Sequence, residues 1–412
     1  KTKVFRGLTE QEFAWVLYDV GNSAFVLLSS ALIPVYFKSI AEPGSSVVVA
    51  WGYAETVASL ILALLMPILG SLADYKGNKK KFFMGTVIIG VICCALLGFP
   101  SQALPFLILY VVAAVMLNGS MVFYDAFLVD AAESDDRLDM VSSHGYAWGY
   151  IGSCLPFIAS LVIVLFGSNF GINMSTGMKI AFLITAVWWF VFSLPLVRNV
   201  HQVNYKEDDG TGIKLGGVMR GLATTLKSIA KDKRLLFFVI AYFFYIDGVH
   251  TIIKMSTSYG TDLGIDATQL VLALLMTQFV AFPSAIAYGK LAGKFGTRKM
   301  LCIAVFAYLC ITLFAAFLLR SALEFWILAF AVGLFQGGIQ ALSRSEFGKL
   351  IPKEHANEYY GFFDIFGKYA AILGTFLMSV FTQVTGNASL GVLSIAVLFI
   401  LGIVFLVRMP KE

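Results

Sequence analysis

The feature that most constrains this chain is a succession of apolar runs, each long enough to cross a lipid bilayer. A membrane-spanning helix needs about 20 consecutive, mostly apolar residues, and twelve such runs can be laid along the 412 residues. Only 13% of the residues are charged, against about 25% in an ordinary soluble domain. The runs exclude a water-soluble fold and predict an all-α membrane protein with twelve transmembrane helices. They are centred near Phe25, Leu60, Val91, Met116, Leu155, Val187, Asp247, Thr277, Tyr308, Gly333, Tyr369 and Ala396.

The basic residues predict how these helices are oriented. We expect no cleavable signal peptide, because residues 1–11 are polar and Thr9 with Glu12 forms a capping-box pattern that begins the first membrane helix. An even number of spans puts both termini on one side, and loops on that side hold 25 of the 30 basic residues. By the positive-inside rule both termini are cytoplasmic, and we expect a multi-pass protein of a bacterial cytoplasmic membrane.

A hydrophilic stretch in the middle of the chain divides six spans from six. The predicted organisation is an N-terminal six-helix bundle (residues 1–200), a cytoplasmic linker (201–233) and a C-terminal six-helix bundle (234–412). Within the linker, apolar residues recur at helical spacing opposite basic ones, which predicts an amphipathic helix on the cytoplasmic leaflet, with a partner-binding helix as the alternative. The apolar positions are Val218, Leu222, Leu226 and Ile229.

A loop motif occurs twice, once in each half. The loop after the second span reads Gly70-x-x-x-Asp74-x-x-Gly77-x-Lys79-Lys80, and the loop after the eighth reads Gly289-x-x-x-Gly293-x-x-Gly296-x-Arg298-Lys299, at an offset of 219 residues. Two six-helix halves with parallel topology are therefore indicated, as in secondary transporters.

This motif resembles the signature of the major facilitator superfamily, which implies two pseudo-symmetric six-helix bundles. We expect Gly70 and Gly77 to permit close helix approach and a tight turn, and Asp74 to accept hydrogen bonds from a helix N-terminus. The lysines Lys79 and Lys80 are expected to stay in headgroup water. The loop would act as a conformational latch, asymmetric because Gly293 replaces the acid in the second copy. The predicted latch residues are Gly70, Asp74, Gly77, Lys79, Lys80, Gly289, Gly296 and Arg298.

Ionisable groups inside the spans mark a candidate binding region, since each costs about 2.5–3.5 kcal/mol at a helix centre on insertion scales. Asp247, His250 and Lys254 share one helical face, and Asp19 recurs in the first half beside aromatic residues. Acidic, basic, aromatic and amide groups together suit a small zwitterion. The predicted binding or coupling residues are Tyr18, Asp19, Asn22, Tyr124, Asp125, Trp148, Asp247, His250, Lys254, Gln336, Gln340, Asp364 and Lys368.

Two of these features have a structural alternative. Asp364 and Lys368 stand four residues apart, so they could form a self-neutralising pair that makes a buried helix tolerable. Glu55 could similarly be a structural partner at the external rim. The five cysteines lie in apolar runs without metal-ligand spacing, so we expect no metal site.

Longer segments resemble the autophagy-related vacuole effluxer family, including its bacterial branch of unassigned major facilitators. They include WVLYDVGNSAF (residues 15–25), FYDAFLVDAA (123–132), IAYFFYIDGVHTI (240–252), QFVAFPSAIAYGKLAGKFGTRK (278–299) and the stretch 337–374. The resemblance covers nearly the whole chain and implies an amino-acid exporter. The chain departs from the family pattern at Asp125 and Asp364, where Asn is usual, and at Gly21, where Ala is common.

The sequence therefore predicts a secondary active transporter that exports an amino acid or similar zwitterion by rocker-switch alternating access, with proton coupling left open. It has no Walker phosphate loop, metal-ligand cluster or nucleophile elbow, so we expect no enzyme activity and no cofactor. The expected partners are a small-molecule substrate, protons and the lipid bilayer, without nucleic acid, for a monomer. The alternatives are a metal or organic-cation exporter using Asp19, Asp247 and His250, and a non-transporting receptor or scaffold.

Overall fold

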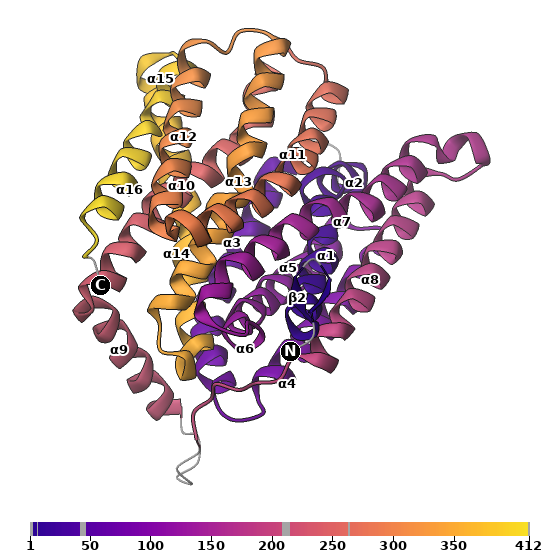
Figure 1. The fold of residues 1–412 in the computed structure, drawn as a ribbon. Coiled ribbons are helices and arrows are strands. Elements are labelled where there is room, and N and C mark those ends of the chain that lie inside the picture. The colour runs from indigo at the N-terminus through magenta and orange to yellow at the C-terminus, as the bar shows by residue number, and fades with distance from the viewer. Residues whose placement is uncertain (1–2, 6, 42–46, 208–214, 263, 411–412) are drawn as a thin grey trace. The chain divides into compact units, whose positions relative to one another are not determined.

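The chain is helical almost throughout (Figure 1). The computed structural model describes residues 3–5, 7–41, 47–207, 215–262 and 264–410. Two short antiparallel strands, β1 (Lys3–Phe5) and β2 (Leu8–Thr9), precede the helices. The first half contains α1 (Glu10–Ala31), α2 (Ile33–Ile40), α3 (Val47–Ala73), α4 (Lys79–Leu96), α5 (Ala103–Ala126), α6 (Leu128–Ala131), η1 (Asp135–Arg137), α7 (Leu138–Phe166), η2 (Gly167–Phe170) and α8 (Met174–Asn199).

The second half repeats this pattern of long helices. It contains α9 (Leu215–Lys231), α10 (Lys233–Asp262), α11 (Ala267–Phe295), α12 (Thr297–Phe317), α13 (Ala322–Leu350), η3 (Lys353–His355), α14 (Ala356–Thr385), α15 (Ala388–Ser394) and α16 (Ala396–Arg408). Each of the twelve predicted span centres falls inside one of the helices of the two halves.

Among the residues that the structure describes, ten helices or helix pairs are long and apolar enough to cross a membrane. The other two predicted centres lie in α1 and α4. Helix α1 includes three acids, at Glu10, Glu12 and Asp19, and α4 begins with three lysines. Many of the long helices leave large apolar side chains outside, such as Leu64 at 72% and Leu155 at 65% exposure. Lipid tails can cover such surfaces, and helices satisfy their own backbone groups there.

The helices form two compact units. Unit 1 comprises residues 1–133, 148–219 and 353–361, and unit 2 comprises residues 134–147, 220–352 and 362–412. Two helices pass from one unit into the other. Helix α7 begins in unit 2 and continues in unit 1, whereas α14 begins in unit 1 and continues in unit 2. Each unit therefore contains the start of a helix whose remainder belongs to the other.

The core of unit 1 forms where α1 packs against α8 and α4 packs against α5. Helix α1 begins with the predicted capping box. The Glu12 amide donates to Thr9 Oγ1 over 3.3 Å, and the Thr9 amide donates to Glu12 Oε2 over 2.8 Å. Trp15 and Trp189 are fully buried in this core. A fixed helix start and large aromatic anchors thus set the rotation of α1, which carries Asp19.

The core of unit 2 forms where α11 packs against α13 and α10 packs against α16. Tyr308 of α12 stacks on Phe399 of α16, with ring centroids 5.7 Å apart. Phe399 also fills the space beside Gly248 on α10, where an added Cβ would lie 2.5 Å from its ring. This close contact fixes the position of α10 at Gly248, the residue that follows Asp247.

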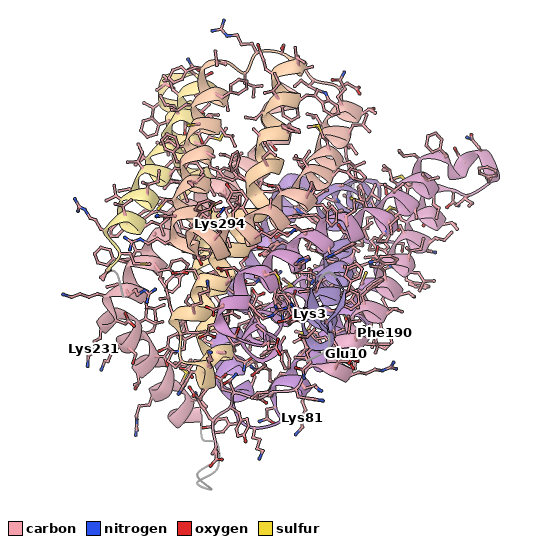
Figure 2. All side chains as sticks on the ribbon, viewed as in Figure 1. Lys3, Glu10, Lys81, Phe190, Lys231 and Lys294 are labelled. Carbon is pink, nitrogen blue, oxygen red and sulfur yellow. The ribbon has the colours of Figure 1, made fainter. Side chains whose placement is uncertain are left out.

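Helix α9 has the amphipathic character predicted for the linker. Val218, Leu222 and Ile229 are buried, with 5–7% of their surface exposed. Leu226 is 45% exposed, and Thr225, at 6% exposure, lies in the buried stripe with the other three. Lys231, labelled in Figure 2, is exposed at the end of this helix.

Candidate functional site

Unit 1 contains a buried carboxylate on α1. Asp19 is only 3% exposed. Its Oδ2 accepts a hydrogen bond from the Tyr124 hydroxyl over 2.8 Å, and its Oδ1 accepts one from Asn22 Nδ2 over 3.4 Å. The Tyr124 ring stacks on Trp15 with centroids 4.3 Å apart, and Trp15 Nε1 donates to the Tyr124 carbonyl over 2.8 Å. The aromatic stack therefore fixes the donor that holds Asp19.

Tyr18 and Asn22 complete this group. Tyr18 is fully buried, exchanges a hydrogen bond with the Ser120 hydroxyl, and accepts one from Trp189 Nε1 over 3.3 Å. Asn22 Nδ2 also donates to the Tyr18 carbonyl over 2.9 Å. The structure thus brings four predicted site residues together, namely Tyr18, Asp19, Asn22 and Tyr124. Asp125 and Trp148, also predicted, are half-buried in the same unit.

Unit 2 contains a second buried carboxylate on α10. Asp247 is fully buried. Its two oxygens accept the backbone N–H of Gly374 over 2.8 and 3.0 Å, and Oδ1 accepts the Thr251 hydroxyl over 3.3 Å. An added Cβ at Gly374 would lie 2.2 Å from Thr251 Oγ1. The glycine therefore allows α14 to approach closely enough for its backbone to reach the carboxylate.

The other predicted residues of unit 2 differ in exposure. His250, Gln340 and Asp364 are half-buried, Gln336 is 5% exposed, and Lys254 is exposed. The side chain of Lys368 lies outside the described residues. Glu55, in unit 1, accepts a hydrogen bond from the Tyr110 hydroxyl, in keeping with its structural alternative.

The loop after α3 binds the first turn of α14. Asp74 is 1% exposed and accepts the backbone N–H of Asn357 over 2.9 Å, its side-chain amide over 2.7 Å, and the backbone N–H of Glu358 over 3.1 Å. A carboxylate here satisfies amides that have no partner within the helix. A Cβ at Gly70 would lie 2.5 Å from the Asn357 carbonyl, so glycine is needed for this close approach.

Lys79 of the same loop is buried. The expectation that it stays in headgroup water is wrong. Its ammonium group lies 2.6 Å from Asp130 Oδ2, both side chains are fully buried, and it also donates to the Ala126 carbonyl over 3.2 Å. The short helix α6 carries Asp130 to this position, and the ion pair compensates both charges. Lys80 is half-buried, with its Nζ 3.2 Å from His201 Nδ1.

A segment of the linker, residues 202–206, lies along this loop, and we call it the strap. The Gln202 side chain accepts from the Gly77 amide over 2.9 Å and donates to the Asp74 carbonyl over 3.2 Å. The Lys206 amide donates to the Asp74 carbonyl over 2.8 Å, and its carbonyl accepts from the Lys76 amide over 3.3 Å. The strap is thus bonded to the loop mainly through backbone groups.

The strap also supplies a cation. Lys206 Nζ lies 2.9 Å from Glu358 Oε2 and 3.9 Å from Asp74 Oδ2, and both acids are 1% exposed. Asp74, His355 and Glu358 place potential ligand atoms within 4.8 Å of one another, and the Lys206 ammonium provides the compensating charge. Burial raises the pKa of Asp74 to about 6, while Lys206, Lys79 and the Asn357 hydrogen bonds act in the opposite direction.

The second copy of the motif, in unit 2, uses an acid from a different place. Asp139, in the first turn of α7, accepts the Thr297 hydroxyl over 2.7 Å and the Ser345 hydroxyl over 2.6 Å, and pairs with Lys349 at 2.6 Å. A Cβ at Gly289 would lie 3.2 Å from the Asp139 carbonyl. The second motif loop therefore contacts the start of α7. The acid at this contact is Asp139, which belongs to α7 and not to the loop.

The remaining motif residues have local roles. Gly77 and Gly296 have φ values of +76° and +91°, a conformation that other residues adopt only with strain. Arg298 donates to the carbonyls of Leu406 and Val407 over 2.7 and 2.5 Å. Arg298 therefore caps the C-terminal end of α16.

Comparison with known proteins identifies the family. A family model described as "Vacuole effluxer Atg22 like" matches residues 45–412. The chain belongs to the Atg22-like family. It is 45% identical over 418 residues to the uncharacterized MFS-type transporter YxiO of Bacillus subtilis, a match that covers 99% of this chain and 97% of that protein. It is also 23% identical over 404 residues to autophagy-related protein 22 of Saccharomyces cerevisiae strain S288c, covering 89% of this chain and 74% of that protein.

Solved structures show the same fold. The transporter FucP in its outward conformation superposes with a TM-score of 0.74 at 12% identity, over 98% of this chain and 99% of that chain. The human organic anion transporter MFSD10 gives a TM-score of 0.74 at 13% identity, over 96% and 98% of the two chains. The predicted major facilitator fold is confirmed. This member of the Atg22-like family is a secondary transporter in a membrane and not an enzyme.

Sequence reasoning missed several residues of these clusters in the Atg22-like chain. Arg344 is 1% exposed and donates to the Ser142 hydroxyl over 2.9 Å and to the Ser142 carbonyl over 3.0 Å. Lys206, Glu358 and Asp139 were also not predicted. The sequence near these three residues does not reveal their partners, because the contacts of Lys206 with Glu358 and of Asp139 with Thr297 join residues more than 150 positions apart.

The pKa of Asp74 predicts a pH-dependent stability. Because folding raises this pKa from 3.8 to about 6, Asp74 contributes stability that is fully present below about pH 4 and is lost as the pH rises through about 6, amounting to about 3 kcal/mol. In Asp74→Asn the difference between thermal midpoints at pH 4 and pH 7.5 should therefore shrink. The exposed acid Asp136, changed to Asn, is the control. An equal difference between the two thermal midpoints in the wild type, Asp74→Asn and Asp136→Asn would show that Asp74 does not cause the pH dependence.

Removing the strap's cation should leave a buried acid without its partner. Lys206→Met is expected to lower the free energy of unfolding by about 1–3 kcal/mol, seen as a lower thermal midpoint. Adding Glu358→Gln should recover part of the loss, because the buried charge is then gone. Lys81→Met, at an exposed lysine labelled in Figure 2, should change little. Additive effects of the two substitutions would show that Lys206 and Glu358 are not coupled.

Proposed function

We propose that this chain exports a small zwitterionic solute, an amino acid in the first instance, by rocker-switch alternating access coupled to protons. Its two pseudo-symmetric bundles, residues 1–200 and 234–412, would be joined by the cytoplasmic linker 201–233, with both termini cytoplasmic. Membership of a family described as vacuole effluxers supports export. The choice of an amino acid as the substrate starts from the resemblance to amino-acid exporters.

The observation that carries the proposal is the pair of buried carboxylates, one on α1 and one on α10. Asp19 and Asp247 are 3% and 0% exposed, and each accepts hydrogen bonds from neighbouring residues of its own unit. A buried, ionised acid inside a membrane is costly, and protonation or an ammonium ligand lowers this cost. Both conditions suit a coupling group that exchanges a proton or a substrate ammonium during the cycle.

The positive side of a zwitterion site would come from His250 and Lys254. They stand three and seven residues after Asp247 on α10, and Lys254 is exposed. Lys254 is therefore available to a solute carboxylate, whereas the fully buried Asp247 is held by Gly374 and Thr251. Under this proposal Asp125 and Asp364, both half-buried, modify ion coupling at the edges of the site.

Transport into proteoliposomes tests this function. With radiolabelled amino acids and an imposed pH gradient, Asp19→Asn should lower uptake or exchange roughly tenfold or more, equivalent to about 1.4 kcal/mol in the barrier. Asp247→Asn should do the same. Glu55→Gln is the matched control, because Glu55 is an intramembrane acid bonded to Tyr110.

Other outcomes separate the alternatives. Transport of divalent metals or organic cations, without transport of amino acids, would replace the zwitterion proposal with the cation exporter. A receptor or scaffold would transport none of these solutes, and its function would be lost on deletion of α9 but retained in Asp19→Asn and Asp247→Asn.

A further inference from the structure

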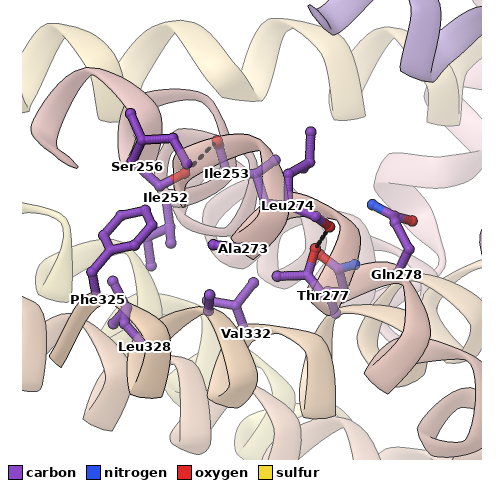
Figure 3. Close-up of a pocket in the computed structure, with 13 residues that line it drawn as sticks. Ile252, Ile253, Ser256, Ala273, Leu274, Thr277, Gln278, Phe325, Leu328 and Val332 are labelled. Carbon is purple, nitrogen blue, oxygen red and sulfur yellow. Dashed lines mark hydrogen bonds between the residues drawn. The ribbon is translucent and has the colours of Figure 1, made fainter. Parts of the chain in front are cut away.

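Unit 2 contains a pocket between α10, α11 and α13 (Figure 3). Its volume is about 80 Å³, several times the roughly 10–15 Å³ that one water molecule needs on this measure. None of the described residues that line it is charged. The lining residues include Ile252, Ile253, Ser256, Leu270, Leu274, Thr277, Gln278, Phe325, Leu328, Val332 and Gln336. Any group that enters must therefore be uncharged, because a charge here would have no partner in the lining.

Two glutamines line this pocket, Gln278 on α11 and Gln336 on α13. Helices α11 and α13 run alongside each other in parallel, since Gly333 approaches Thr277 and the Ser284 hydroxyl donates to the Leu334 carbonyl. Gln278 follows Thr277 by one residue and Gln336 follows Gly333 by three. Figure 3 shows Phe325 and Gln278 toward opposite ends of the pocket.

The carboxamides of this pocket have no hydrogen-bond partner among the described residues. Gln278 is 8% exposed and Gln336 is 5% exposed. The pocket hydroxyls differ, because each is bonded within its own helix. Thr277 Oγ1 donates to the Leu274 carbonyl over 2.6 Å, and Ser256 Oγ donates to the Ile253 carbonyl over 3.0 Å. The amide atoms of Gln278 and Gln336 are not among the fully buried, unpaired polar atoms. Both are therefore accessible to a group that enters the pocket and can hydrogen-bond to it.

We propose that the pocket binds the uncharged, carboxamide-bearing end of the transported solute, which identifies the solute as a glutamine- or asparagine-type amino acid. This inference rests on the proposed function. The methylene stem of such a side chain would pack against Leu274 and Val332. Its carboxamide offers both donors and acceptors to Gln278 and Gln336.

Competing side chains fit the lining less well. An aliphatic side chain fills the apolar part but makes no hydrogen bond to either carboxamide, and sites built to hydrogen-bond a group reject analogues that lack it. A carboxylate side chain has the right shape but brings a charge that no lining residue compensates. The pocket therefore distinguishes glutamine from both leucine and glutamate.

Calorimetry on the full-length protein in detergent tests the pocket. L-glutamine should bind about 10- to 100-fold more tightly than L-leucine or L-glutamate. Gln278→Leu and Gln336→Leu should each weaken glutamine binding about tenfold or more and leave leucine binding unchanged or tighter. Gln383→Leu is the control, because Gln383 is an exposed glutamine on α14 outside the pocket.

The outcomes distinguish the pocket from the proposed function. Leucine or glutamate binding as tightly as glutamine would overturn the pocket proposal and leave amino-acid transport standing, and this wild-type comparison suffices if the leucine variants do not fold. Binding of propionamide that depends on Gln278 and Gln336, with no binding of any amino acid, would support the pocket as a carboxamide site and overturn amino-acid transport. No binding of glutamine or propionamide would overturn the pocket proposal.

Discussion

The structure depends on pairing or hydrogen-bonding the charges that it buries. Within a bilayer protein a buried ion without a partner costs several kcal/mol, and breaking an existing pair costs more than the pair contributes. The chain has few charges, and several of them form the contacts that hold helix ends in place. Lys79 pairs with Asp130, Lys349 pairs with Asp139, and Asp74 accepts the amides at the start of α14. Charges that would otherwise destabilise the protein therefore determine where α7 and α14 begin.

The two loop motifs meet this requirement in different ways. Both use a glycine, Gly70 or Gly289, where a neighbouring helix start comes too close for a side chain. In unit 1 the acid belongs to the loop and the compensating cation comes from the strap, whereas in unit 2 the acid is Asp139 of the approaching helix. The shared constraint is therefore steric. The electrostatic solution differs because Gly293 cannot supply a carboxylate, and Thr297 and Lys349 then provide groups that bind one.

Much of the fold could be predicted because it rests on patterns local to the chain. The apolar runs gave all twelve helix positions, the capping box gave the start of α1, and the motif glycines gave the turns at Gly77 and Gly296. Clusters that join distant residues could not be predicted in the same way. Lys206 and Glu358 are 152 positions apart, and nothing in either local sequence distinguishes them from solvated residues. The burial of Lys79 was missed for the same reason, since its partner Asp130 lies on another helix.

The charge-free pocket of unit 2 contrasts with the carboxylate sites. Under the proposed function, Asp19 and Asp247 engage an ammonium group or a proton, but these groups are common to every amino acid and cannot select among side chains. Selection requires a region that differs between substrates, and a lining without charge excludes charged side chains by the cost of desolvation. Two carboxamides in the lining narrow the choice further, because they favour a side chain that hydrogen-bonds to them over an apolar one. Coupling and specificity would then be served by separate groups, so the side-chain preference could change through Gln278 and Gln336 without altering the coupling carboxylates.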